Sequence, residues 1–127
     1  MLNLPVAVRI FVFTGVADMR KSFDGLAMLV EQHIRQNPES GHLYVFFNRR
    51  RDRAKLLFWQ GDGLVIWYKR LEQGVFPEPR ATRTSSGRST QQKKPSSVEL
   101  RAGELAMLLD GVDPTTVVRR KRYRRAG

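Results

Sequence analysis

The fold is decided by one stretch of the sequence: Lys55-Leu56-Leu57-Phe58-Trp59-Gln60-Gly61-Asp62-Gly63-Leu64-Val65-Ile66-Trp67-Tyr68-Lys69. Two runs rich in aromatic and aliphatic residues, 55–60 and 64–69, flank a turn of two glycines and an aspartate. Gly and Asp adopt the backbone conformations that tight turns between strands require. The stretch therefore predicts a β-hairpin, and both a two-residue and a three-residue loop fit the turn.

Two more strands are predicted on the N-terminal side of this hairpin. Residues 6–14 alternate and contain many β-branched and aromatic residues, which predicts a strand that ends at Gly15. Residues 42–48 are almost continuously apolar, which is typical of a strand buried on both faces in the centre of a sheet.

A helix is predicted between these two strands. Apolar residues recur at helical spacing from residue 21 to about residue 36. Asp18 or Ser22 could cap its start, and Asn37-Pro38 would end it. The order β-α-β-β-β predicts an α+β fold, a mostly antiparallel sheet with one packed helix.

The C-terminal part has a different composition. Residues 80–95 hold no bulky apolar side chain, so they predict a flexible linker. A short helix is expected at about 101–110, with Gly111 as its C-cap. A capping box formed by Ser96 and Glu99 would start this helix earlier, and a short strand at 98–100 fits equally well.

These elements predict four regions along the chain. They are an α+β core domain at 1–79, the linker at 80–95, a short helical segment at 96–112 and a basic tail at 113–127.

Length and composition limit the class of protein. The 127 residues, 41% of them hydrophobic, suffice for one domain with a modest core. The absence of cysteine excludes disulfides, thiolate catalysis and Cys-type zinc sites, and fits a reducing cytoplasm. No apolar run approaches the roughly 20 residues that cross a bilayer, and the N-terminal residues do not resemble a secretory signal. We therefore expect a cytoplasmic protein.

The net charge of +11 is unevenly placed. Residues 1–79 have a net charge of +3 and residues 80–127 a net charge of +8. Clustered guanidinium groups suit a polyanion because each can donate two hydrogen bonds to one phosphate. Nucleic acid is thus the first partner to consider, although binding to a membrane surface would give the same composition.

The candidate nucleic-acid-binding residues form three clusters and one pair. The pair stands at the expected helix start, where the helix dipole also favours an anion. The clusters precede the hairpin, follow it, and lie near the end of the sequence. The candidates are Arg20, Lys21, Arg49, Arg50, Arg51, Arg53, Lys55, Lys69, Arg70, Arg119, Arg120, Lys121, Arg122, Arg124 and Arg125. A merely solvated surface is the alternative, and for Lys69-Arg70 the two interpretations are equally good.

Catalysis needs converging groups, and the sequence offers few. The acidic candidates for two-metal chemistry are Asp18, Asp24, Asp52 and Asp62, but helix capping, a helix first turn, local charge balance and a hairpin turn explain them. His33 and His42 have no ligand-spaced companions. We therefore expect no enzyme activity, no catalytic or metal-binding residues and no cofactor.

Aromatic residues on the expected strands allow two interpretations. Neighbouring residues of a strand point to opposite faces, so one face can be core while the other exposes rings for bases or for a partner protein. An exposed Trp59 or Trp67 would favour binding. The set is Phe46, Phe47, Phe58, Trp59, Trp67 and Tyr68.

A series of motifs resembles one known family. It comprises Thr14-Gly15-Val16-Ala17-Asp18-Met19-Arg20-Lys21-Ser22-Phe23-Asp24-Gly25-Leu26, Ser40-Gly41-His42-Leu43-Tyr44-Val45-Phe46, the Arg-rich run 48–55, Trp59-Gln60-Gly61-Asp62-Gly63-Leu64, Tyr68-Lys69-Arg70-Leu71-Glu72-Gln73-Gly74-Val75-Phe76 and Leu105-Ala106-Met107-Leu108-Leu109-Asp110-Gly111-Val112. The chain is similar to the TnpB, or Orf2-like, accessory proteins of the insertion-sequence sixty-six group. These are unrelated to the RNA-guided nucleases that share the TnpB label.

The resemblance implies a non-catalytic accessory role in transposition of a bacterial insertion sequence. In such elements a separate DDE transposase carries out the chemistry. The expected partners are DNA at the element ends, the transposase and other element-encoded proteins, and the expected location is the bacterial cytoplasm near the nucleoid. Two hypotheses follow: the protein binds DNA through its basic clusters, or it docks on the transposase without contacting DNA.

Overall fold

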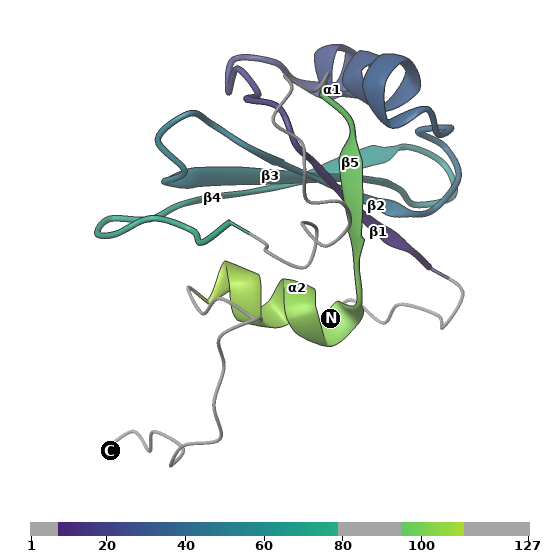
Figure 1. Cartoon of the computed structure of the whole chain (residues 1–127). Helices are drawn as coiled ribbons and strands as arrows, with labels where there is room; N and C mark the ends of the chain where they lie inside the picture. The colour runs from purple at the N-terminus through teal and green to yellow at the C-terminus, as the bar shows by residue number, and fades with distance from the viewer. Residues whose placement is uncertain (1–7, 79–94, 111–127) are drawn as a thin grey trace.

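The computed structural model describes residues 8–78 and 95–110, and its centre is one five-stranded sheet. The spatial order of the strands is β4-β3-β2-β1-β5 (Figure 1). Their bounds are β1 Ile10–Phe13, β2 Leu43–Phe47, β3 Arg53–Trp59, β4 Leu64–Arg70 and β5 Ser97–Leu100. β1 and β2 run parallel, and the other three pairs are antiparallel. The predicted α+β class with a mostly antiparallel sheet is confirmed.

The predicted hairpin is formed by β3 and β4. It pairs residues from Arg53 with Arg70 to Trp59 with Leu64. Beyond the last pair, the Gln60 N–H donates to the Gly63 carbonyl over 2.9 Å, which leaves two central residues in the turn. The first of them, Gly61, has a φ of +94°, a backbone conformation that side-chain-bearing residues rarely adopt.

The predicted first helix is present, but it is shorter than expected and has two parts. Helix α1 (Phe23–Leu29) continues into a π-helical turn, η1 (Val30–Ile34). Ser22 occupies the N-cap position without a side-chain capping bond. Arg35 ends the helix with a φ of +60°, two residues before the Asn37-Pro38 pair that was expected to end it.

One face of the sheet is covered by α1 and η1 (Figure 1). Leu26, Val30 and Ile34 pack there on aromatic residues of β1 and β2. The hydroxyl of the buried Tyr44 donates to the Asn37 carbonyl over 3.2 Å and lies 2.9 Å from the Ser40 hydroxyl. The polar end of this core residue is therefore satisfied, as a buried hydroxyl requires.

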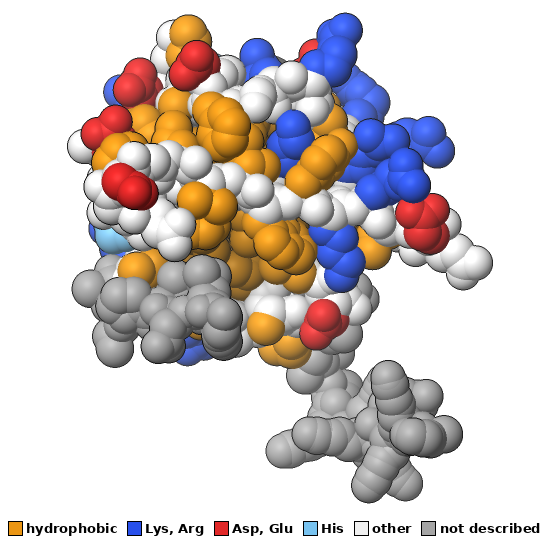
Figure 2. Space-filling model, turned by 180° about the vertical axis from the view of Figure 1, so that it is seen from behind, with side chains coloured by type: hydrophobic (Ala, Val, Ile, Leu, Met, Phe, Trp, Pro, Cys, Tyr) orange, Lys and Arg blue, Asp and Glu red, His pale blue; other side chains and the backbone are white. Residues whose placement is uncertain are grey.

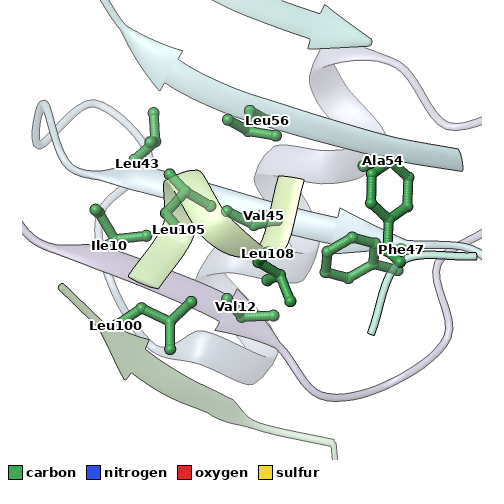
Figure 3. Packing of buried hydrophobic residues seen from close by; sticks show 11 residues of the cluster. Ile10, Val12, Leu43, Val45, Phe47, Ala54, Leu56, Leu100, Leu105 and Leu108 are labelled. Carbon is green, nitrogen blue, oxygen red and sulfur yellow. The ribbon is translucent and has the colours of Figure 1, made fainter. Parts of the chain in front are cut away.

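The opposite face is covered by the second helix, α2 (Ala102–Leu109). Figure 3 shows its Leu105 and Leu108 lying over Val12 and Val45 of the central strands. Periodicity predicts this helix but not where it packs. The Glu104 side chain accepts a 2.8 Å hydrogen bond from the Arg101 N–H, which satisfies one backbone group at the start of the helix.

β5 decides between the alternatives for residues 96–100. Of the two, the short strand is the one that forms, and it pairs with β1 from Phe13 with Ser97 to Ile10 with Leu100. The earlier helix start at Ser96 is therefore wrong, because the backbone of this segment is used in the sheet.

Several sequence-based expectations fall outside the described residues. The predicted strand at 6–14 is observed as Ile10–Phe13, and residues 1–7 are not described. Most of the expected linker at 80–95, Gly111 and the basic tail at 113–127 are likewise outside the described ranges.

We expect Leu108→Ala to destabilise the protein strongly. Leu108 is fully buried between α2 and the sheet, so its truncation leaves a cavity, which costs about 2–5 kcal/mol. Urea unfolding measures this loss, with Ala106→Ser on the exposed side of the same helix as the control. An unfolding free energy for Leu108→Ala equal to that of the control would contradict the placement of α2.

Candidate nucleic-acid interface

The basic residues of the folded region meet at one end of the sheet. The carboxyl ends of the parallel strands β1 and β2 lie at the same end of the sheet. A 3.0 Å hydrogen bond from the Ala17 N–H to the Phe47 carbonyl joins the segment that follows β1 to the end of β2. β3 begins and β4 ends at this same end of the sheet, since Arg53 pairs with Arg70. The topology therefore brings together basic residues from four separate segments.

Arg49 and Arg50 lie in a tight turn organised by Asn48. The Asn48 side-chain oxygen accepts hydrogen bonds from the N–H groups of Asp52 and Arg53, at 3.1 and 3.0 Å. Its amide group donates to the Asp52 carboxylate over 2.7 Å, and this bond holds the pKa of Asp52 below its ordinary value. Both arginines are exposed, and neither side chain makes a hydrogen bond or an ion pair with any described residue. Of the arginines in this turn, these two are therefore the candidates for contact with a ligand.

Asn48 was missed as a site residue because sequence reasoning concentrated on charge. The available signal was an asparagine directly after a buried strand, a position where its side chain commonly bonds the backbone of a turn.

Arg53 and Arg70 face each other across β3 and β4. The Arg53 guanidinium donates to the Tyr68 hydroxyl over 3.1 Å, and this bond raises the pKa of Arg53. Arg70 forms an exposed 3.0 Å ion pair with Glu72. Like charges directly opposite each other in a sheet repel, so a bound anion would relieve this pair.

Arg20 also lies at this end, but it already has a partner. Its guanidinium lies 2.8 Å from the Asp18 carboxylate, and the Arg20 N–H donates to the same group over 2.9 Å. These bonds hold the pKa of the Asp18 carboxyl far below its usual value. Asp18 thus closes a turn before the helix and does not cap the helix itself.

Arg51 has a structural role. Its guanidinium donates to the carbonyls of Phe76 and Pro77, at 3.0 and 2.8 Å, and lies 4.3 Å from the centre of the Phe47 ring. Burial lowers the pKa of this arginine. The side chain connects the segment after β4 to the end of β2, and we do not include it among the candidate ligand-binding groups.

Lys55 has a structural role as well. The residue is only 7% exposed, and its ammonium donates to the carbonyls of Met19 and Lys21 over 2.9 and 2.8 Å. It also lies 4.7 Å from the centre of the Tyr68 ring. Lys55 therefore fastens the segment before α1 to the hairpin, a role that its place in an Arg-rich run did not suggest.

The remaining basic candidates lie elsewhere. The Lys69 ammonium points to the other face of the sheet and donates to the Leu109 carbonyl of α2 over 3.4 Å. Lys21 is half-buried beside Arg20, and its carbonyl holds Lys55. The tail candidates Arg119, Arg120, Lys121, Arg122, Arg124 and Arg125 lie outside the described residues.

Figure 2 shows the molecule from behind the view of Figure 1. Lys and Arg side chains gather along one side of this face, next to a hydrophobic area. We define the basic patch as Arg20, Arg49, Arg50, Arg53 and Arg70. Its charges can form forked hydrogen bonds with phosphate groups, which is the chemistry that arginine clusters perform best.

The exposure of the aromatic residues differs between strands. Phe46 and Phe47 on β2 are buried, and Phe58 and Trp59 on β3 are half-buried. On β4, Trp67 is 42% exposed and Tyr68 is 47% exposed, and they point to opposite faces of the sheet.

The acidic residues and histidines are separated. Asp24 lies in the first turn of α1 and Asp62 in the hairpin turn, as their sequence positions predicted. His42 accepts a 3.1 Å hydrogen bond from the Arg9 N–H, and His33 lies against the Phe13 ring. Within residues 8–78 and 95–110, no group of three or more metal-ligating side chains comes together. In the same ranges, no helix has the length and apolar character needed to span a membrane.

The family of the chain is identified by a match to a sequence model. A sequence model described as "IS66 Orf2 like protein" matches residues 8–119, which include every described strand and helix. The chain belongs to this IS66 Orf2-like family. The family expected from the sequence motifs is therefore confirmed, and the protein is an accessory protein of transposition of an insertion sequence.

Two curated relatives cover most of the IS66 Orf2-like chain. Both come from Sinorhizobium fredii (strain NBRC 101917 / NGR234). Uncharacterized protein y4hO is 31% identical over 106 residues, which are 84% of this chain and 82% of the relative. Uncharacterized protein y4jC is 30% identical over 113 residues, which are 89% and 86% of the two chains. No solved structure matches this chain.

We expect Lys55→Met to destabilise the IS66 Orf2-like protein. Methionine keeps the apolar stem but leaves the Met19 and Lys21 carbonyls without their donor, which costs about 1–3 kcal/mol. Thermal unfolding should show a lower midpoint than that of Lys21→Met. The Lys21→Met control removes a charge from the segment before α1, and the Lys21 ammonium makes no hydrogen bond with a described residue. Equal midpoints for the two variants would contradict the structural role of Lys55.

Proposed function

We propose that this protein is a non-catalytic, DNA-binding accessory factor of transposition that holds DNA phosphates with its basic patch. The observation that carries the proposal is the gathering of arginines from four segments at one end of the sheet, where Arg20, Arg49, Arg50 and Arg70 are exposed and Arg53 is half-buried. Arg49 and Arg50 have no partner among the described residues, and Arg53 and Arg70 face each other.

Phosphate is the ligand that best suits this arrangement. A merely solubilising surface does not require arginines to converge, and like charges at close range repel unless a counterion neutralises them. The phosphates of DNA repeat along the backbone, so one strand can engage several arginines together. Asp18 and Glu72 offset part of the positive charge of the patch through Arg20 and Arg70. We therefore assign Arg49 and Arg50 the largest share of the binding.

In the proposal, strand cleavage and joining are left to the separate DDE transposase of the element, as the family resemblance implies. Among the described residues, Asp18, Glu72, Glu99 and Glu104 pair with arginines, and Asp52 accepts a hydrogen bond from Asn48. In this proposal the accessory protein acts in the cytoplasm near the nucleoid, at the ends of the element.

We expect the double change Arg49→Ala and Arg50→Ala to weaken DNA binding and to lower its salt dependence. Each lost phosphate contact reduces the slope of log affinity against log salt by roughly 0.9. The double variant should therefore have a slope smaller by roughly 2. Fluorescence anisotropy of labelled element-end DNA over a salt series measures both quantities.

The matched control changes Arg9 and Arg101 to Gln. This pair removes the same charge near the β5 edge, opposite the hairpin edge of the sheet. The control should bind nearly as the unchanged protein does. A slope that falls equally in both double variants, or is near zero in the unchanged protein, would refute the phosphate-binding patch.

A second function is favoured by a different observation. On the α2 face of the hairpin, Trp67 is 42% exposed beside the half-buried Val65 and Phe58. β4 also lies at an edge of the described sheet, where backbone groups can pair with an added strand. A protein-interaction module that docks on the transposase without contacting DNA would use this surface.

We expect Trp67→Ala to separate docking from DNA binding. If the protein docks through this surface, the full-length variant should retain much less transposase in a pull-down from nuclease-treated extract. Arg49→Ala should retain as much as the unchanged protein, because its side chain belongs to the basic patch. Undiminished retention by Trp67→Ala would remove the support for docking at this surface.

A further inference from the structure

We propose that the DNA form bound at the basic patch is single-stranded and that Tyr68 stacks on one of its unpaired bases. This inference rests on the proposed function, because it specifies the form of DNA that the same arginines hold. It assigns to Tyr68 a direct contact with the ligand, which phosphate binding alone does not require.

Tyr68 lies on the same face of the hairpin as Arg53 and Arg70. In a strand, side chains two residues apart share a face, so Tyr68 and Arg70 point the same way. Arg53 pairs with Arg70 across the ladder and donates to the Tyr68 hydroxyl over 3.1 Å. An exposed aromatic ring is thus placed directly beside two phosphate-binding groups.

The Tyr68 ring is held in position before any ligand arrives. Its hydroxyl accepts the hydrogen bond from Arg53, and the Lys55 ammonium lies over one face of the ring, 4.7 Å from the ring centre, so a base would stack on the other face. Lys55 is itself fixed by two backbone carbonyls. Nevertheless, the residue remains 47% exposed. A ring that is fixed and accessible loses little conformational entropy when it stacks on a base.

The ring distinguishes single strands from duplex DNA. In a duplex the bases are stacked on one another, so a side chain reaches their faces only by inserting between base steps or after a base is flipped out. In a single strand the base faces are accessible, and proteins bind them by combining aromatic rings with a positively charged path for the backbone. The position of Tyr68 at the sheet edge, beside the arginines, meets both requirements.

The test compares oligothymidylate with a duplex of mixed sequence at equal salt, using anisotropy and the full chain. The unchanged protein should bind the single strand more tightly. Tyr68→Leu should weaken single-strand binding roughly tenfold or more, since each stacked base is worth about that much. Its affinity for the duplex should change less than twofold. Tyr68→Phe should retain most of the single-strand affinity because the ring remains.

The matched control is Trp67→Leu, which removes a similarly exposed ring from the neighbouring position on the opposite face. It should leave single-strand binding within twofold. A second measurement does not depend on substitution. Ultraviolet cross-linking of an iodouracil-containing single strand to the unchanged protein, mapped by mass spectrometry, should mark Tyr68.

The outcomes separate this proposal from the one on which it rests. Equal losses of single-strand and duplex affinity in Tyr68→Leu, with no cross-link at Tyr68, would overturn stacking. If duplex binding still depended on Arg49 and Arg50 in that case, the phosphate-binding patch would stand. If the unchanged protein bound neither DNA form at low salt, both proposals would fail.

Discussion

The burial of β1 and β2 on both faces is the constraint on which the rest of the structure depends. Every residue of these strands is buried, so their alternate side chains form two separate cores. One core needs α1 and η1 as cover, and the other needs α2. A sheet whose centre is apolar on both faces cannot face water on either one. The C-terminal helix therefore belongs to the fold, although a stretch of 16 residues outside the described ranges, 79–94, precedes its strand and helix.

The sequence predicted most of the elements because their signals are local. The Gly-Asp turn, the apolar run at residues 43–47 and the spacing of Leu26, Val30 and Ile34 each specify a structure within a few residues. Pairing between distant segments has no such signal. For that reason the parallel register of β1 with β2 and the place of α2 could not be predicted. The left-handed conformation of Arg35, which ends the first helix, also depends on the surrounding structure.

For the candidate site, the sequence predicted which residues are charged but not what each charged side chain contacts. Arg49, Arg50, Arg51 and Lys55 look equivalent in a basic run, yet only the first two point freely into solvent. Arg51 and Lys55 instead satisfy backbone carbonyls within the protein. The difference arises from tertiary contacts. Arg51 contacts Phe76 and Pro77, and Lys55 contacts Met19 and Lys21, all of which lie far from the basic run in the sequence. A basic cluster can therefore contain both exposed side chains and side chains that stabilise the fold.

The pairing of β5 with β1 has a consequence for how the chain folds. It joins Ile10 to Leu100, so one of the two most buried strands acquires its second neighbour from near the other end of the sequence. During synthesis on a ribosome, one edge of β1 and one apolar face of the sheet stay uncovered until residues 97–109 have emerged. Contacts between such distant segments also slow folding, because a long loop must close before they form. The nascent protein is thus most vulnerable to aggregation and to proteolysis until residues 97–109 have emerged and paired.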